Sequence, residues 1–305
     1  MDLFADGVED ARNLRSLQAC ARLFGAHLYV RPGGRRVAAS RDPTLPVGPP
    51  LRDLRQRYDL LVALETGDHS QNLFAYRMPP VSSIALVVGN ERRGITPWVR
   101  AHADVTLHIP SGRMRQRSLN VACAAGLGLA ALRASSARSR FGVSCATRPD
   151  LLFWNPSDPG ELGSALRTAW VLGWDRVLLR DDRGVWFTTD RQRYAAGRAA
   201  ARCPRNVIRV TLLPEHRAPW QLAVIVTPRG TASAMWRSHA RWPASTAVII
   251  VDEASADDAG EAVARLAVRA VRWNPGVASD LDPAAYPQHV IASVALGRIV
   301  AGQGG

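Results

Sequence analysis

The chain has 305 residues, which is enough for two domains of about 150 residues that each bury a core. With 47% hydrophobic and 21% charged residues, it has the composition of a soluble globular protein. It shows no run of about 18 apolar residues and no basic, then apolar, N-terminal segment. We therefore expect a cytoplasmic protein without a membrane span or a secretory signal.

The formal net charge of +13 is carried by arginine alone, because the sequence contains no lysine. Guanidinium groups pair with phosphates and stack on bases, so this excess favours a nucleic-acid partner. A GC-rich genome produces the same arginine bias, and charge alone leaves the question open. The four cysteines and seven histidines follow no CxxC or HExxH spacing, so we predict neither a disulfide framework nor a metal site.

Residues 1–140 alternate apolar runs with helical segments. We predict a helix over 12–24, strands over 26–30, 60–64, 84–88 and 105–109, and a closing helix over 119–132. Short strands between helices are typical of an α/β fold with a parallel sheet. Residues 133–140 are small, polar and basic, and look like a linker that ends the first domain at 140.

The same order of elements begins again in a second domain, 147–305. We predict strands over 151–154, 177–179, 222–226 and 247–251, and helices over 160–172 and 290–300. Three segments of the first half align with the second: 20–30 with 168–179, 84–91 with 246–253, and 121–132 with 292–302. This self-similarity predicts a tandem duplication.

Two segments of the first half resemble motifs of the SpoU/TrmH branch of the knotted SPOUT methyltransferases. LVVGNERRGI (86–95) is similar to the second motif of that family, and DVTLHIPSGRMRQRSLNVACAAGLGLAAL (104–132) to its third. The second half contains PGELGSALRTAWVLGW (159–174), which resembles the first motif of the family, N-x-G-x-x-x-R-x-A. The resemblance implies trefoil-knotted domains and methyl transfer from S-adenosylmethionine to a ribose 2′-hydroxyl of tRNA or rRNA.

The resemblance also implies a set of site residues. The cofactor-binding residues would be Leu86, Val88, Gly89, Asn90, Glu91, Ile109, Pro110, Ser118 and Leu119. The missing side chain of Gly89 would let the backbone approach the cofactor. Asn120 belongs to the expected catalytic group, and Arg113, Arg115 and Arg117 would contact RNA, unless they form an ordinary solvated basic loop.

The two halves differ from the motifs in complementary places. Val251 replaces Gly89, and its side chain would occupy the cofactor's approach; our alignment puts His289 opposite Ser118 and Ile291 opposite Asn120. The first half has Ala19 where the second has the motif arginine, Arg167. Members of the family are usually homodimers with shared sites. We therefore expect a monomeric pseudo-dimer with one composite active site.

In this site Arg167 would orient the hydroxyl or a phosphate and stabilise the developing alkoxide, because its pKa is too high for a base. The motif has asparagine six residues before its arginine, and this chain has Glu161 there. Glu161 can be a capping-box residue behind Asp158, or a catalytic carboxylate that faces the substrate and accepts its proton.

Three other functions stay open at this point. A fused enzyme of this kind could methylate a small molecule in specialised metabolism, since eight of the nine tryptophans lie at or after Trp154 and could line an apolar pocket. It could be an inactive RNA-binding module. It could also protect its host from an antibiotic by methylating rRNA.

Overall fold

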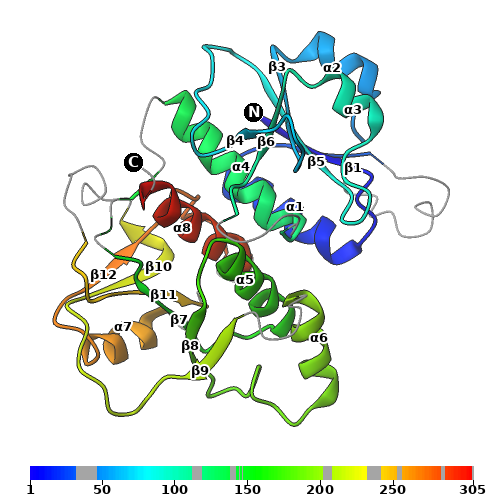
Figure 1. Cartoon of the computed structure of the whole chain (residues 1–305). Helices are drawn as coiled ribbons and strands as arrows, with labels where there is room; N and C mark the ends of the chain where they lie inside the picture. The colour runs from blue at the N-terminus through cyan, green and yellow to red at the C-terminus, as the bar shows by residue number, and fades with distance from the viewer. Residues whose placement is uncertain are drawn as a thin grey trace. The chain divides into compact units, whose positions relative to one another are not determined.

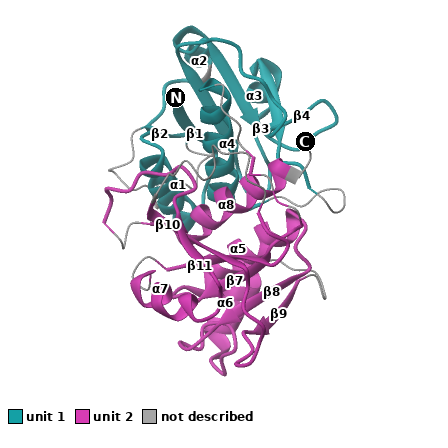
Figure 2. Ribbon diagram, turned by 90° about the vertical axis from the view of Figure 1, so that its left-hand side faces the viewer, with its two compact units in different colours: residues 1–141 teal, residues 142–305 magenta. Residues whose placement is uncertain are grey.

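A computed structural model describes residues 1–31, 47–111, 119–137, 142–143, 145, 147–201, 208–231, 242–252, 256–282 and 286–303. The chain divides into two compact units, residues 1–141 and 142–305 (Figure 2). Within the described ranges, no helix is both long and apolar enough to cross a membrane.

The first unit is built on a sheet of six parallel strands (Figure 1). In chain order these are β1 (Asp2–Asp6), β2 (Leu28–Arg31), β3 (Leu60–Leu64), β4 (Gln71–Asn72), β5 (Ile84–Gly89) and β6 (Val105–His108). They lie in the order β2-β1-β5-β3-β6-β4, so β5 pairs with both β1 and β3, and Leu86 lies opposite Leu3 and Val62. The inner strands are apolar along their length, as expected for parallel strands that are covered on both faces.

Helices cover both faces of this sheet. On one face α4 (Val121–Ser136) packs against α1 (Ala11–Leu23) and against β5, where Gly128 brings it close to Leu86. On the other face α2 (Leu51–Arg57) and α3 (Pro97–His102) bury Leu54 and Val99 against Val87 of β5. The unit is therefore a three-layer α/β/α structure.

The second unit has its own sheet of six parallel strands. These are β7 (Asp150–Trp154), β8 (Arg176–Arg180), β9 (Arg209–Leu212), β10 (Leu222–Thr231), β11 (Thr246–Val251) and β12 (Ala270–Trp273), in the order β12-β10-β11-β7-β8-β9. Helix α7 (Ala256–Ala264) covers one face, where Ala259 packs with Ile249 and Val251. Helices α5 (Pro159–Val171) and α8 (Gln288–Gln303) pack on each other, and α6 (Arg191–Ala201) packs on α5.

The two units share one topology. Five strands run in the order β2-β1-β5-β3-β6 in the first unit and β8-β7-β11-β10-β12 in the second. The helices α1 and α5 each have 13 residues, begin after an aspartate N-cap (Asp10, Asp158) and end before a glycine with positive φ (Gly25, Gly173). Their alignment places Asn13 opposite Glu161 and Ala19 opposite Arg167. The common topology supports the predicted duplication, which remains a prediction.

The α/β class and the parallel sheets predicted from the sequence are confirmed. The predicted linker is wrong in its first half, because residues 133–136 continue α4 and the Arg133 side chain donates a hydrogen bond to the Phe24 carbonyl. The trefoil knot stays a prediction, since residues 112–118 lie outside the described residues.

Candidate active site

The carboxyl ends of β1, β3, β5 and β6 meet at one edge of the first sheet, the edge at which open α/β sheets bind ligands. The loop after β5 folds back over the end of its own strand. A Cβ atom on Gly89 would lie 2.2 Å from the carbonyl carbon of Gly94 and 2.3 Å from the amide nitrogen of Ile95. Gly89 is therefore required by this loop, and the approach of a cofactor to its backbone stays a prediction.

Three polar side chains hold the loop in place. The buried Asn90 accepts hydrogen bonds from the amides of Arg92 (2.9 Å) and Arg93 (3.1 Å) and donates to the Gly7 carbonyl (2.6 Å). Asp6 accepts from the Thr96 amide (2.8 Å) and Glu65 from the Ile95 amide (3.0 Å). The Asn90 side chain thus fixes the backbone of this loop, and its role in cofactor binding stays a prediction.

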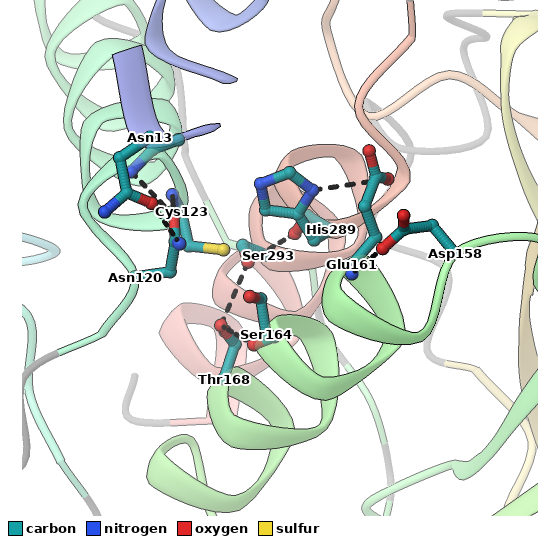
Figure 3. A network of polar contacts seen from close by, with 10 residues as sticks. Asn13, Asn120, Cys123, Asp158, Glu161, Ser164, Thr168, His289 and Ser293 are labelled. Carbon is teal, nitrogen blue, oxygen red and sulfur yellow. Dashed lines mark hydrogen bonds and ion pairs between the residues drawn. The ribbon is translucent and has the colours of Figure 1, made fainter. Parts of the chain in front are cut away.

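A chain of amide and carboxylate groups links this loop to helix α1 and to the start of helix α4. Asn13 Nδ2 donates to Glu91 Oε1 (2.5 Å), and Asn120 Nδ2 donates to Asn13 Oδ1 (3.0 Å; Figure 3). Asn120 also caps α4 by accepting from the amides of Ala122 and Cys123. Two residues that the sequence analysis selected as site residues, Glu91 and Asn120, are therefore joined through Asn13, which the alignment of the halves puts at the motif asparagine.

The remaining cofactor candidates fall into three groups. Ile109, Pro110 and Leu119 are half-buried, in the segments that follow β6 and precede α4. Leu86 and Val88 are buried strand residues, and the side chain of Leu86 packs against α4. Ser118, Arg113, Arg115 and Arg117 lie outside the described residues.

The donor set at this edge fits S-adenosylmethionine. Ile109, Pro110 and Leu119 offer half-buried apolar surface beside backbone amides and carbonyls, the groups that contact an adenosine. None of these three side chains carries a positive charge that would repel a sulfonium. Burial, with the Cys123 thiol nearby, raises the pKa of Cys20 far above its usual range, so this thiol is a poor nucleophile.

In the second unit, Glu161 lies in the first turn of α5. Its amide donates to Asp158 Oδ1 (2.8 Å), so Asp158 is the N-cap of the helix. The Glu161 carboxylate lies 3.3 Å from Nδ1 of His289, which is buried at the start of α8 (Figure 3). A capping box also requires the Asp158 amide to donate a hydrogen bond back to the Glu161 carboxylate. The described hydrogen bonds do not include this bond, so the capping-box interpretation of Glu161 is only half met.

Further along the same two helices, hydroxyl groups form a buried network. Ser293 Oγ donates to Thr168 Oγ1 (3.1 Å) and lies 2.7 Å from the carbonyl of His289, while Thr168 is bonded to the Ser164 carbonyl. Arg167, the predicted catalytic arginine, is half-buried on α5 beside this network.

Contacts within each unit correct two details of our alignment. His289 contacts Glu161 as Asn120 contacts Asn13, so His289, and not Ile291, is the counterpart of Asn120. Val251 is buried in the apolar cluster under α7, where it packs with Ile249 and Ala256. Its side chain therefore fills the core, and the expected obstruction of a cofactor by Val251 has no support.

Residues 2–130 match the SpoU rRNA Methylase family. A comparison with curated proteins found no significant match. The family match stops within α4, so it covers the first unit only.

Solved structures with partial similarity include SpoU and TrmH proteins. One, assigned to the TrmH family of RNA methyltransferases from Porphyromonas gingivalis, is 27% identical and covers 45% of this chain and 59% of its own, with a TM-score of 0.37. The A. aeolicus TrmH/SpoU tRNA modifying enzyme is 24% identical, and the match covers 45% of this chain and 75% of that enzyme, with a TM-score of 0.37. The SpoU methyltransferase AviRb from Streptomyces viridochromogenes, in complex with AdoMet, is 22% identical. The match covers 46% of this chain and 59% of AviRb, with a TM-score of 0.36.

Proposed function

Residues 2–130 belong to the SpoU rRNA methylase family, and from this premise we propose that the chain is an S-adenosylmethionine-dependent methyltransferase that modifies a ribose 2′-hydroxyl of tRNA or rRNA. The observation that carries the proposal is the linked group Asn13, Glu91 and Asn120. It fixes the loop after β5 and the start of α4 against each other, and both segments lie within the family match.

The first unit would hold the cofactor at the carboxyl edge of its sheet. Ile109, Pro110 and Leu119 would contact the adenosine, and the loop that Asn90 and Glu65 fix would close the other side. The bound cofactor supplies a sulfonium methyl group, so no metal is required for the chemistry. The protein has to align the hydroxyl and move one proton.

We assign the charge-stabilising role to Arg167 of the second unit. The alignment of α1 with α5 puts Ala19 in the corresponding position of the first unit, which therefore lacks a motif arginine. The first unit has the family's cofactor segments and the second has the arginine. This division of residues supports a single site that draws on both, in a chain that acts as a monomer.

The proton would pass from the ribose hydroxyl to Glu161 as the new C–O bond forms and the C–S bond breaks. A carboxylate suits this task because it is an acceptor, whereas the guanidinium of Arg167 has no free lone pair at neutral pH. His289 lies against the Glu161 carboxylate and would hold it in one orientation.

Nucleoside analysis tests the proposal. The protein is incubated with methyl-labelled S-adenosylmethionine and total tRNA or rRNA, and the digested RNA is examined by mass spectrometry. We expect a labelled 2′-O-methylnucleoside. A labelled base would correct the acceptor atom, and the absence of any labelled nucleoside would refute the RNA substrate and favour a small-molecule acceptor.

A further inference from the structure

We propose that a basic, aromatic surface on α6 of the second unit is a docking site for single-stranded RNA. This α6 patch consists of Phe187, in the loop before the helix, and Arg191, Tyr194 and Arg198 on the helix; the buried Trp186 ring lies against Arg198 and supports it. The inference rests on the proposed function for its choice of RNA as the partner. It uses none of the residues assigned to the methyl-transfer site.

The position of α6 sets it apart from the topology that the units share. It lies between β8 and β9, and packs along α5 (Figure 1). The two helices approach closely, because a Cβ on Gly163 would lie 2.3 Å from the carbonyl oxygen of Gly197. Among the described residues of the first unit, no helix packs in this way on α1, so α6 is an addition that the common fold does not need.

Exposed aromatic side chains are concentrated in the α6 patch. Phe187 is 49% exposed and Tyr194 is 47% exposed, and they are the two aromatic residues among the large exposed hydrophobic side chains of the described chain. Phe187 lies in the loop before α6 and Tyr194 on its exposed side, and burial of either ring by a partner would gain hydrophobic free energy. Aromatic faces stack on bases of any sequence, which makes single-stranded nucleic acid a suitable partner.

The rings are held in a defined arrangement. The Asp181 carboxylate accepts hydrogen bonds from the amides of Val185 (2.7 Å), Trp186 (3.0 Å) and Phe187 (2.8 Å), which orders the loop that carries Phe187. The guanidinium of Arg198 lies 5.0 Å from the ring centre of Trp186 and 5.0 Å from that of Tyr194. A preordered surface loses less conformational entropy on binding than a flexible one.

The charge of the patch matches a phosphate backbone. Arg191, Tyr194 and Arg198 follow one stripe of α6 at the spacing i, i+3, i+7. The helix sequence RQRYAAGRAAA has three arginines and no acidic residue. The carboxylate of Asp190, just before the helix, accepts hydrogen bonds from the first-turn amides of Gln192 and Arg193. In the described structure none of the three arginines forms an ion pair, so their charges are available to phosphates.

The test measures binding of a fluorescein-labelled 12-nucleotide single-stranded RNA to the full chain by fluorescence anisotropy. Phe187→Ala with Tyr194→Ala should weaken binding at least about tenfold, since each stacking contact contributes substantially. Arg191→Gln should reduce the dependence of affinity on salt. The matched controls are Val268→Ala and Arg265→Gln, two exposed residues elsewhere in the same unit, which should change affinity less than about twofold.

Calorimetric binding of S-adenosylmethionine and a thermal melt of each variant show that the fold and the cofactor site are intact. RNA binding that is unchanged in the double variant would overturn the inference and leave the proposed function standing. Patch-dependent RNA binding without methyl transfer to any RNA would support the inference and refute the proposed function. Binding to phosphatidylserine vesicles but not to RNA would assign the patch to a membrane surface and overturn the inference.

Discussion

In the second unit, Nδ1 of the buried His289 lies 3.3 Å from a carboxylate oxygen of Glu161. The corresponding place in the first unit is filled by the hydrogen-bonded amides of Asn13 and Asn120. In the second unit, the starts of α5 and α8 are therefore joined by two ionisable side chains. In the first unit, the starts of α1 and α4 are joined by two neutral amides.

This pair should show energetic coupling. We expect the double variant Glu161→Ala/His289→Ala to be less destabilised than the sum of the single variants, by about 1 kcal/mol, because removing either partner leaves the other without it. Urea unfolding of the four proteins measures this difference. Additive losses would mean that the two side chains contribute independently.

Removal of the Arg167 guanidinium should separate binding from catalysis. Arg167→Ala is expected to leave S-adenosylmethionine affinity nearly unchanged, while the rate of methyl transfer falls by about a hundredfold or more, the effect of losing one preorganised charge-stabilising group. Calorimetry and single-turnover kinetics report the two quantities. Adding Ala19→Arg should not restore the rate, and a recovery would show that the first unit can use an arginine of its own.

The chain should bind one equivalent of cofactor. Only residues 2–130 match the methylase family, and the second unit has Glu161 and His289 in place of the asparagine pair. Isothermal titration calorimetry with S-adenosylmethionine is expected to give a stoichiometry of one per chain. Two equivalent sites would contradict the division of roles between the units.

Gly89 should be intolerant of even a methyl group. In Gly89→Ala the new Cβ would meet the backbone of Gly94 and Ile95, which must move, and we expect a loss of about 2 kcal/mol in stability together with loss of cofactor binding. Gly67→Ala is the matched control, since nothing lies within 4 Å of its Cβ position. Equal melting temperatures for the two variants would show that the loop adjusts without cost.

Asp104 should contribute to stability above acidic pH. Burial of the carboxylate acts to raise its pKa, but hydrogen bonds from Arg55 and the Leu61 amide outweigh burial and lower the pKa below its usual value. A lowered pKa in the folded state means that the stabilisation is present at neutral pH and is lost as the pH falls through that pKa.

Asp104→Asn should therefore reduce stability at neutral pH by about 1 kcal/mol and flatten the decline of stability below about pH 4. Thermal melts across this range test it, with Asp68→Asn as the exposed control. A variant that keeps the acid dependence of the parent would show that other carboxylates cause it.

The apolar runs were sufficient to predict most of the two sheets. The predicted strand 60–64 coincides with β3, and 84–88 lies within β5. Strand β1 was not predicted because aspartates enclose its three apolar residues, although it is buried between β2 and β5. Helix α6 was missed because its sequence has no apolar face; it buries Gly197 and Ala201 against a neighbouring helix.

The candidate site was predictable where it follows local motifs and not where it depends on distant contacts. Glu91 and Asn120 could be selected from sequence, but the role of Asn13 depends on hydrogen bonds to residues 78 and 107 positions away. The slip that put Ile291 opposite Asn120 arose in helices rich in alanine and glycine, whose side chains are too alike to fix a register. Hydrogen bonds, in contrast, distinguish His289 from its neighbours.

The inner position of β1 has a consequence for synthesis of the protein. Leu3 pairs with Leu28 on one side and with Leu86 on the other, so β1 stays half-paired during synthesis until β5 has emerged. During that interval a buried apolar strand has a free edge, which is a template for pairing with other chains. We therefore expect that slowing translation before Gly89 increases aggregation of the nascent first unit.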